Sequence, residues 1–193
     1  MKVLLVSATK KEIKYYKNND LEIIITGIGI PNTILNLTKK LSEATYDLVI
    51  NVGICGSFKK HFKIGNVVEI INDKFSEIGY EEGSNIKEFD NSFKIINNFN
   101  VNAKTNLEHV SSITVNTVHG NKDSIKKIMA RLNPDVESME GAAVFMVCQH
   151  YNTKCIQLRA ISNYVEERNK NNWNIPLALK NLGDLLNQKI YEL

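Results

Sequence analysis

The stretch from residue 136 to residue 164 constrains the fold more than any other part of the chain. Its first half carries apolar side chains at helical spacing, with Glu140 near their start. Residues 155–161 then form an apolar run typical of a buried strand, except that it contains Arg159 and leads to the polar Asn163. In α/β sheets, strand carboxyl ends and helix starts meet at one edge, where ligands bind. The stretch therefore predicts a ligand pocket.

Bulk composition predicts one ordinary domain. A chain of 193 residues can build one full core, so we expect a single domain over residues 1–193. The net charge of +3 and the scattered lysines argue against a nucleic-acid partner. No run approaches the roughly 18 apolar residues of a membrane span. Three cysteines without paired spacing indicate a reducing compartment, so we expect a cytoplasmic protein without a disulfide framework. No Cys/His cluster has zinc spacing, so we expect no metal.

Strand-like runs alternate with helix-like segments. Strands are expected at residues 2–6, 22–26, 47–52, 66–71, 112–116 and 155–161. Helices are expected at residues 10–16, after a glycine turn at residues 27–29, from Asp123 as N-cap to Leu132, from Glu140, and from residue 174 to Ile190. This alternation predicts a three-layer α/β/α domain with a central mixed, mostly parallel sheet.

Residues 72–107 are weakly patterned. Asn, Lys and Glu dominate there, and burial is expected only for Phe93, Ile95, Ile96 and Phe99. The sequence does not say which of these residues contact a ligand, and the segment could include a mobile lid.

Several candidate site residues also have a purely structural interpretation. Gly27 and Gly29 follow a strand, but residue 32 is Asn, so the dinucleotide-binding fingerprint is incomplete and a tight turn or a close backbone approach to a small ligand is expected. Glu12 alone could be a solvated residue, and Glu140 could serve only the helix dipole. Arg159 is harder to explain structurally, because a buried charge needs a carboxylate partner or a ligand.

Five segments together resemble the nucleoside phosphorylase superfamily, nearest its hydrolytic nucleosidase branch. They are residues 3–12, 26–30, 51–56, 136–143 and 158–163. Three further runs resemble the futalosine hydrolases more specifically: residues 114–121, 161–169 and 173–181, with Glu167 where proline is expected. The resemblance implies cofactor-free hydrolysis of futalosine to hypoxanthine and dehypoxanthine futalosine, on a menaquinone route, by a cytoplasmic homodimer.

The resemblance also implies residue roles. Glu12 would position and deprotonate the attacking water, and Arg159 would lie near that water. Glu140 would accept hydrogen bonds from the ribose hydroxyls, and Met139 would pack against the sugar. The remaining substrate-binding residues are expected to be Ile28, Gly56, His119 and Trp173.

Asn163 is expected to choose the base. By resemblance, adenine-releasing nucleosidases have an aspartate at this position. A 6-oxopurine presents two acceptors, N7 and O6, and an amide has two hydrogens to donate, whereas a carboxylate would repel O6. Asn163 therefore favours a hypoxanthine-type base, although a simple strand-end cap is the structural alternative.

The loop after the first strand favours hydrolysis over phosphorolysis. Phosphorylases of the superfamily carry a Gly/Arg loop there, whereas residues 7–12 contain no arginine and end in the acid Glu12, which would repel phosphate. Three alternatives stay open at this point. They are a methylthioadenosine or S-adenosylhomocysteine nucleosidase, a 6-oxopurine phosphorylase, and a purine-binding protein of the same fold without catalysis.

Overall fold

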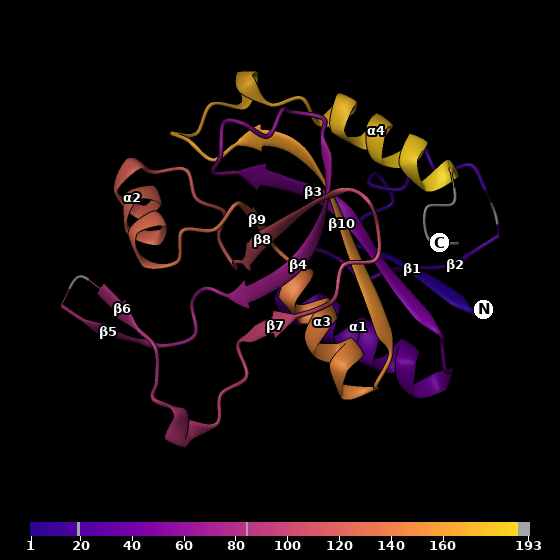
Figure 1. Cartoon of the computed structure of the whole chain (residues 1–193), viewed down its shortest axis with the longest axis horizontal. Coiled ribbons are helices and arrows are strands. Elements are labelled where there is room, and N and C mark those ends of the chain that lie inside the picture. The colour runs from indigo at the N-terminus through magenta and orange to yellow at the C-terminus, as the bar shows by residue number, and fades with distance from the viewer. Residues whose placement is uncertain (19, 84, 189–193) are drawn as a thin grey trace.

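The computed structural model describes residues 1–18, 20–83 and 85–188, and Figure 1 shows a large twisted sheet with helices on both sides. The strands are β1 (Val3–Ser7), β2 (Glu22–Ile25), β3 (Leu48–Ser57), β4 (Val67–Phe75), β5 (Tyr80–Glu82), β6 (Asn85–Lys87), β7 (Asn98–Asn100), β8 (Glu108–Thr114), β9 (Val136–Ser138) and β10 (Lys154–Tyr164). The helices are α1 (Ile30–Glu43), α2 (Lys122–Arg131), α3 (Gly141–His150) and α4 (Ile175–Asn187), with short 3-10 turns η1 (Asn91–Phe93) and η2 (Lys170–Asn172).

The main sheet closes on itself around the long strand β3. Strands β2, β1, β3 and β10 run parallel, and β10 then pairs antiparallel with β4. The sheet continues through β8, which is parallel to β4, to β9, which is parallel to β8. Because β9 also pairs antiparallel with the last residues of β3, the ring is complete. The predicted mixed, mostly parallel sheet is confirmed, and its closure brings β9 against the last residues of β3.

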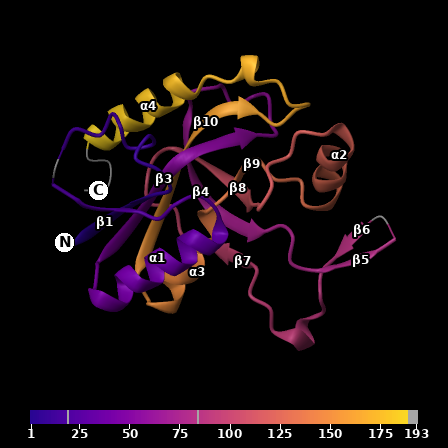
Figure 2. The ribbon, with the colours of Figure 1, turned by 180° about the vertical axis from the view of Figure 1, so that it is seen from behind.

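Two apolar layers explain why the central strands are apolar throughout. Leu5 and its neighbours pack against α4, together with Leu182 and Leu186. Leu4, which points to the opposite face, packs with Leu37 of α1 and with α3. Figures 1 and 2 show α4 on one side of the sheet and α1 and α3 together on the other. The predicted three-layer arrangement is therefore confirmed, and a strand buried on both faces shows no alternation.

Two local predictions were wrong. Residues 10–16 form successive turns rather than a helix, with backbone bonds of the i to i−3 kind such as Glu12 N–H to Thr9 O (3.2 Å). The N-cap of α2 is Asn121 and not Asp123, because the Asn121 side chain accepts hydrogen bonds from the amides of Asp123 and Ser124.

The weakly patterned middle of the chain leaves the main body. The pair β5–β6 forms a separate two-stranded sheet that stands away from the main sheet in Figure 1, and only β7 joins β4. Phe99 in β7 is buried against Phe75, with ring centroids 5.7 Å apart. The predicted burial of three other side chains was wrong, since Phe93, Ile95 and Ile96 are exposed. Ile190, predicted in the last helix, lies outside the described residues.

Candidate active site

A cavity of about 380 Å³ opens where β1, β3 and β10 end, a volume suited to a nucleoside-sized molecule. It holds most of the side chains predicted from the sequence. The predicted residues that line it are Glu12, Ile28, Gly56, His119, Met139, Glu140, Asn163 and Trp173. Arg159 is 1% exposed and is not among the lining residues, so it lies behind the cavity wall.

The chain after β1 turns back so that its own donors hold the Glu12 carboxylate. Oε2 of Glu12 accepts from the Thr9 amide (2.9 Å), the Thr9 hydroxyl (3.1 Å) and the Ser7 hydroxyl (3.2 Å). Oε1 accepts from the amide of Ile54 in β3 (3.3 Å). Glu12 is only 9% exposed, so these bonds fix a nearly buried carboxylate at the cavity wall. The sequence predicted Glu12 just beyond the end of the first strand, and the structure places it there.

Glu140, at the start of α3, faces the glycine turn at residues 27–29. It is the N-cap residue of α3, and its Oε1 accepts from the Gly29 amide at 2.9 Å. Gly29 has a φ of 89°, a left-handed conformation that glycine adopts without strain, and this turns its N–H toward Glu140. Burial raises the pKa of Glu140, while the positive charge of Arg159 and the Gly29 bond oppose that rise. The glycine turn thus orients a carboxylate at the cavity.

Arg159 of β10 lies close to Glu12 because the neighbouring residue in β3 is a glycine. Gly53 of β3 is its register partner, and a side chain on Gly53 would collide with both the Arg159 guanidinium and the Glu12 carboxylate. The two groups therefore flank the same glycine. Nε of Arg159 donates to Oε1 of Gln157 (3.0 Å), and Nη2 is buried without a hydrogen-bond partner among the described residues. The first partner of this buried charge is thus an amide, where the sequence suggested a carboxylate or a ligand.

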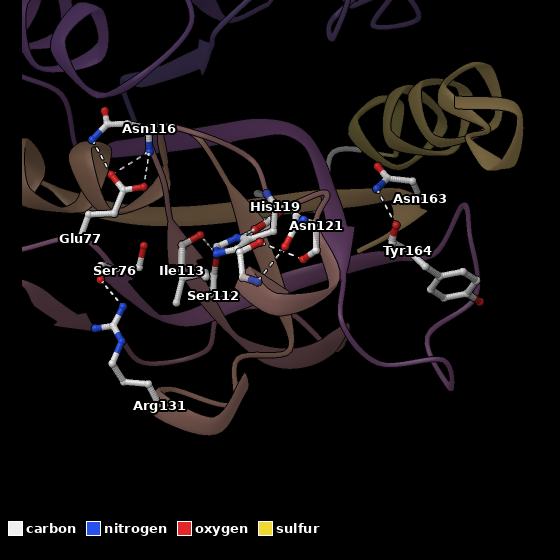
Figure 3. A network of polar contacts seen from close by, with 12 residues as sticks. Ser76, Glu77, Ser112, Ile113, Asn116, His119, Asn121, Arg131, Asn163 and Tyr164 are labelled. Atoms are coloured by element: carbon white, nitrogen blue, oxygen red, sulfur yellow. Dashed lines mark hydrogen bonds and ion pairs between the residues drawn. The ribbon is translucent and has the colours of Figure 1, made fainter. Parts of the chain in front are cut away.

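The amide of Asn163 has a defined orientation. Nδ2 donates to the Tyr164 carbonyl (3.0 Å), as Figure 3 shows, and Oδ1 accepts from the Ser162 hydroxyl (2.8 Å). A carbonyl oxygen can only accept, so the atom that faces it must be the NH₂ nitrogen. One of the two Nδ2 hydrogens is therefore used within the protein. Asn163 keeps one hydrogen for a ligand, and not the two that the sequence alone suggested.

A histidine–carboxylate pair lies near the same end of the cavity. Glu137 is buried and accepts from the His119 amide (3.0 Å), while its other oxygen lies 2.6 Å from Nδ1 of His119. Because a carboxylate only accepts, Nδ1 carries a proton in this pair. The bond leaves Nε2 as the atom through which His119 can contact a ligand.

The far end of the cavity is largely apolar. Trp173 lies beside Ile175 and Leu179 at the start of α4, and the Arg168 guanidinium stacks 5.0 Å from the Trp173 ring centroid. Ile28, which is 56% exposed, stands at the rim. This end presents apolar side chains and one guanidinium, so it suits an apolar or aromatic substituent that is neutral or negatively charged.

The sequence did not assign a role to several lining residues. Glu137, Ser162 and Arg168 all line the cavity. Glu137 gave a usable signal, since it is an acid three residues before Glu140, just ahead of a predicted helix. Arg168 gave none, because a charged residue in a polar loop is normally solvated surface.

The described part of the chain contains no metal-binding cluster of side chains and no helix that could span a membrane. Across residues 1–18, 20–83 and 85–188, no group of three or more His, Cys, Asp or Glu side chains is placed to hold a metal ion. None of the described helices is both long enough and apolar enough to cross a membrane.

Sequence comparison finds relatives of low identity. A purine nucleoside phosphorylase of the DeoD type from Buchnera aphidicola subsp. Schizaphis graminum is 22% identical over 159 residues. That alignment covers 78% of this chain and 66% of the relative, so the chain spans just under two thirds of its length.

Solved structures match over the whole chain. A 5′-methylthioadenosine/S-adenosylhomocysteine nucleosidase from Helicobacter pylori, with butyl-thio-DADMe-Immucillin-A, matches with a TM-score of 0.84 at 17% identity, covering 100% of this chain and 99% of that one. The native futalosine hydrolase of H. pylori strain 26695 matches with a TM-score of 0.77 at 18% identity, covering 100% and 98%. These likenesses establish the fold, and the predicted enzyme class agrees with that of both neighbours. The model of the phosphorylase superfamily matches residues 9–190, and the chain belongs to that family.

Proposed function

We propose that this protein hydrolyses the N-ribosyl bond of a purine nucleoside with water, and does not transfer the ribosyl group to phosphate. The loop after β1 supports hydrolysis. Its amide and hydroxyl donors, from Ser7 and Thr9, are already bonded to the carboxylate of Glu12. A phosphate there would lose those donors and meet a fixed negative charge nearby. Water has neither difficulty, and it can bind beside the carboxylate.

The side chains around this loop divide the work of the reaction. Glu12 orients a water and accepts its proton as the water oxygen bonds to C1′ of the ribose. The bond from C1′ to the base nitrogen breaks at the same time, and the sugar passes through an oxocarbenium-like state by analogy with glycosidases. Arg159 lies behind the cavity wall beside Glu12, and its positive charge would act on the Glu12 carboxylate and on the water that this carboxylate orients. Glu140 accepts from the ribose hydroxyls and stabilises the developing positive charge.

The base end favours a 6-oxopurine, and futalosine is the substrate we propose. Asn163 has one Nδ2 hydrogen left for the ligand, which suits N7 or O6, both acceptors. A neutral amide does not repel O6, and it cannot supply a proton either, so the departing base takes its proton from water. His119, whose Nδ1 is bonded to Glu137, can form a hydrogen bond through Nε2 with a polar atom of the base that Asn163 does not contact.

A second candidate is a nucleosidase for methylthioadenosine or S-adenosylhomocysteine. The observation in its favour is the higher TM-score of the H. pylori nucleosidase, 0.84 against 0.77 for the futalosine hydrolase. The apolar surroundings of Trp173 would accept a methylthio group as readily as the larger substituent of futalosine.

One experiment separates these functions. Futalosine, inosine and methylthioadenosine are each incubated with the protein, with and without phosphate, and the released base is identified by chromatography. We expect hypoxanthine from futalosine at a rate that phosphate does not change. Adenine without hypoxanthine would establish the second candidate. Release only with phosphate would establish a phosphorylase, and no release from any nucleoside would reject catalysis.

A further inference from the structure

Three buried polar side chains form a continuous chain of hydrogen bonds behind the cavity. Arg159, Gln157 and Asp73 are 1%, 0% and 0% exposed. Nε of Arg159 donates to Oε1 of Gln157 (3.0 Å), and Nε2 of Gln157 donates to Oδ2 of Asp73 (3.0 Å). The positive guanidinium is thus joined to a fully buried carboxylate through one amide. Desolvated charges are stable only when they are paired and hydrogen-bonded, so Asp73 serves as a counter-charge for Arg159.

The same carboxylate also holds the start of α3. Oδ1 of Asp73 accepts from the Thr114 hydroxyl (2.9 Å), and that hydroxyl oxygen accepts from the amide of Ala142 (2.7 Å). Gly141 lies so close that a side chain on it would collide with the oxygens of Asp73 and Gln157. Gly141 directly follows Glu140, so one buried network contacts both the strand that carries Arg159 and the helix start that carries Glu140.

We propose that Asp73 and Gln157 are positioning residues that hold the Arg159 guanidinium from behind and fix it relative to Glu140. The inference rests on the proposed function, since it assigns Arg159 to the reacting water. Binding Nε from behind leaves Nη1 close to Gly53, the glycine that the Glu12 carboxylate also flanks. Neither Asp73 nor Gln157 lines the cavity, so their effect must pass through Arg159 and α3.

Exchange of the acid and the amide tests this arrangement. In Asp73→Asn, the new amide offers one acceptor oxygen where Asp73 uses two, and its NH₂ group meets a donor. In Gln157→Leu, the link to Arg159 is removed. In the double variant, Asp73→Asn with Gln157→Glu, the carboxylate introduced at position 157 accepts both from Arg159 and from the amide introduced at position 73. The oxygen of that amide still accepts from Thr114. The network is restored with its charge one step nearer to Arg159.

Kinetics give the first measurement. We expect each single variant to lower kcat about 10- to 100-fold with little change in KM, because misplacement of a catalytic group by about 1 Å has effects of this size. The double variant should recover most of the lost kcat. The matched control is Glu69→Gln, which changes another fully buried acid of β4 that binds Lys104 and Thr105 and has no bond to Arg159. Rates are normalised to the folded fraction from thermal melting.

A spectroscopic measurement keeps the test independent of activity. The chain has three arginines, Arg131, Arg159 and Arg168, so ¹⁵N-arginine labelling gives three Nε–H signals, and Arg159→Lys assigns one of them. We expect that signal to move in Asp73→Asn and Gln157→Leu and to stay in Glu69→Gln. If the wild type cleaves no nucleoside, the proposed function fails while the signal still decides the network. An unmoved Arg159 signal in both single variants, or a folded double variant as slow as they are, would overturn the inference.

Discussion

The two ends of the cavity are built on different principles. At the end proposed for the sugar, Glu12 and Glu140 are carboxylates held by backbone amides, with the charge of Arg159 behind them. At the end proposed for the base, Asn163 is a neutral amide with one hydrogen left, near the hydrogen-bonded pair of His119 and Glu137. Fixed charges act most strongly where charge develops, and neutral donors discriminate between bases. The sugar end should therefore control the rate, and the base end should control the choice of substrate.

Glu12→Gln should have the largest effect and tests the sugar end directly. The amide cannot accept the proton of water, so kcat should fall about 10²- to 10⁴-fold, the usual contribution of a general base. Stopped-assay chromatography of futalosine hydrolysis measures the loss. Glu43→Gln, an exposed acid at the end of α1, is the control and should keep the wild-type rate. A Glu12→Gln variant with a kcat within a few-fold of the wild-type value would show that Glu12 is not the general base.

The places of Glu12 and Glu140 in the fold could be predicted from sequence patterns, because both residues sit at the ends of regular elements. Glu12 follows a buried strand and Glu140 begins a helix, and both positions are visible in the apolar pattern. The sequence could not show that Arg159 binds Gln157 and, through it, Asp73. The residues of this network meet only when β10 and β8 pair with the two sides of β4. The burial predicted for Phe93, Ile95 and Ile96 was wrong for a related reason. The sequence does not show whether an apolar side chain has a packing partner, and these three are exposed.

The pH dependence of the sugar end should follow from Glu140. Burial raises the pKa of Glu140 above its ordinary value, so protonation on the acid side occurs at a higher pH than for an exposed glutamate. As pH falls through that pKa, Glu140 loses its charge and kcat/KM should fall. Glu140→Gln should lower kcat/KM at neutral pH about 10- to 100-fold, as expected for a lost charged hydrogen bond.

The fall of kcat/KM on the acid side of the pH profile, called the acid limb, distinguishes Glu140 from its neighbours. Glu12 and Arg159 both act on Glu140, and Asp73, whose pKa burial raises to about 6, titrates nearby. The acid limb of Glu140→Gln should therefore be shallower than that of the wild type without vanishing. An identical limb in the two proteins would assign the titration to another group.

Asn163→Asp should move the choice of base and leave the sugar end intact. A carboxylate repels O6 and, when protonated, can serve a 6-aminopurine, so the ratio of kcat/KM for inosine to that for adenosine should fall about 10- to 100-fold. Competition between the two nucleosides in one reaction measures the ratio. Asn163→Ala is the matched control, because it removes the donor without adding a charge and should weaken selectivity without reversing it. An unchanged ratio in the aspartate variant would place base recognition elsewhere, with His119 and Glu137 as the next candidates.

Trp173→Leu should have the smallest effect, because it changes no residue proposed to contact the ribose or the base. Trp173 stacks under Arg168 at the apolar part of the cavity, and loss of an aromatic contact there is worth about 0.5–1.5 kcal/mol. KM for futalosine should rise about 2- to 10-fold with kcat unchanged, whereas inosine, which lacks the 5′ substituent, should show a smaller change. A fall in kcat with both substrates would mean that the 5′ contact also positions the sugar, and the division between a rate-controlling end and a selective end would then fail.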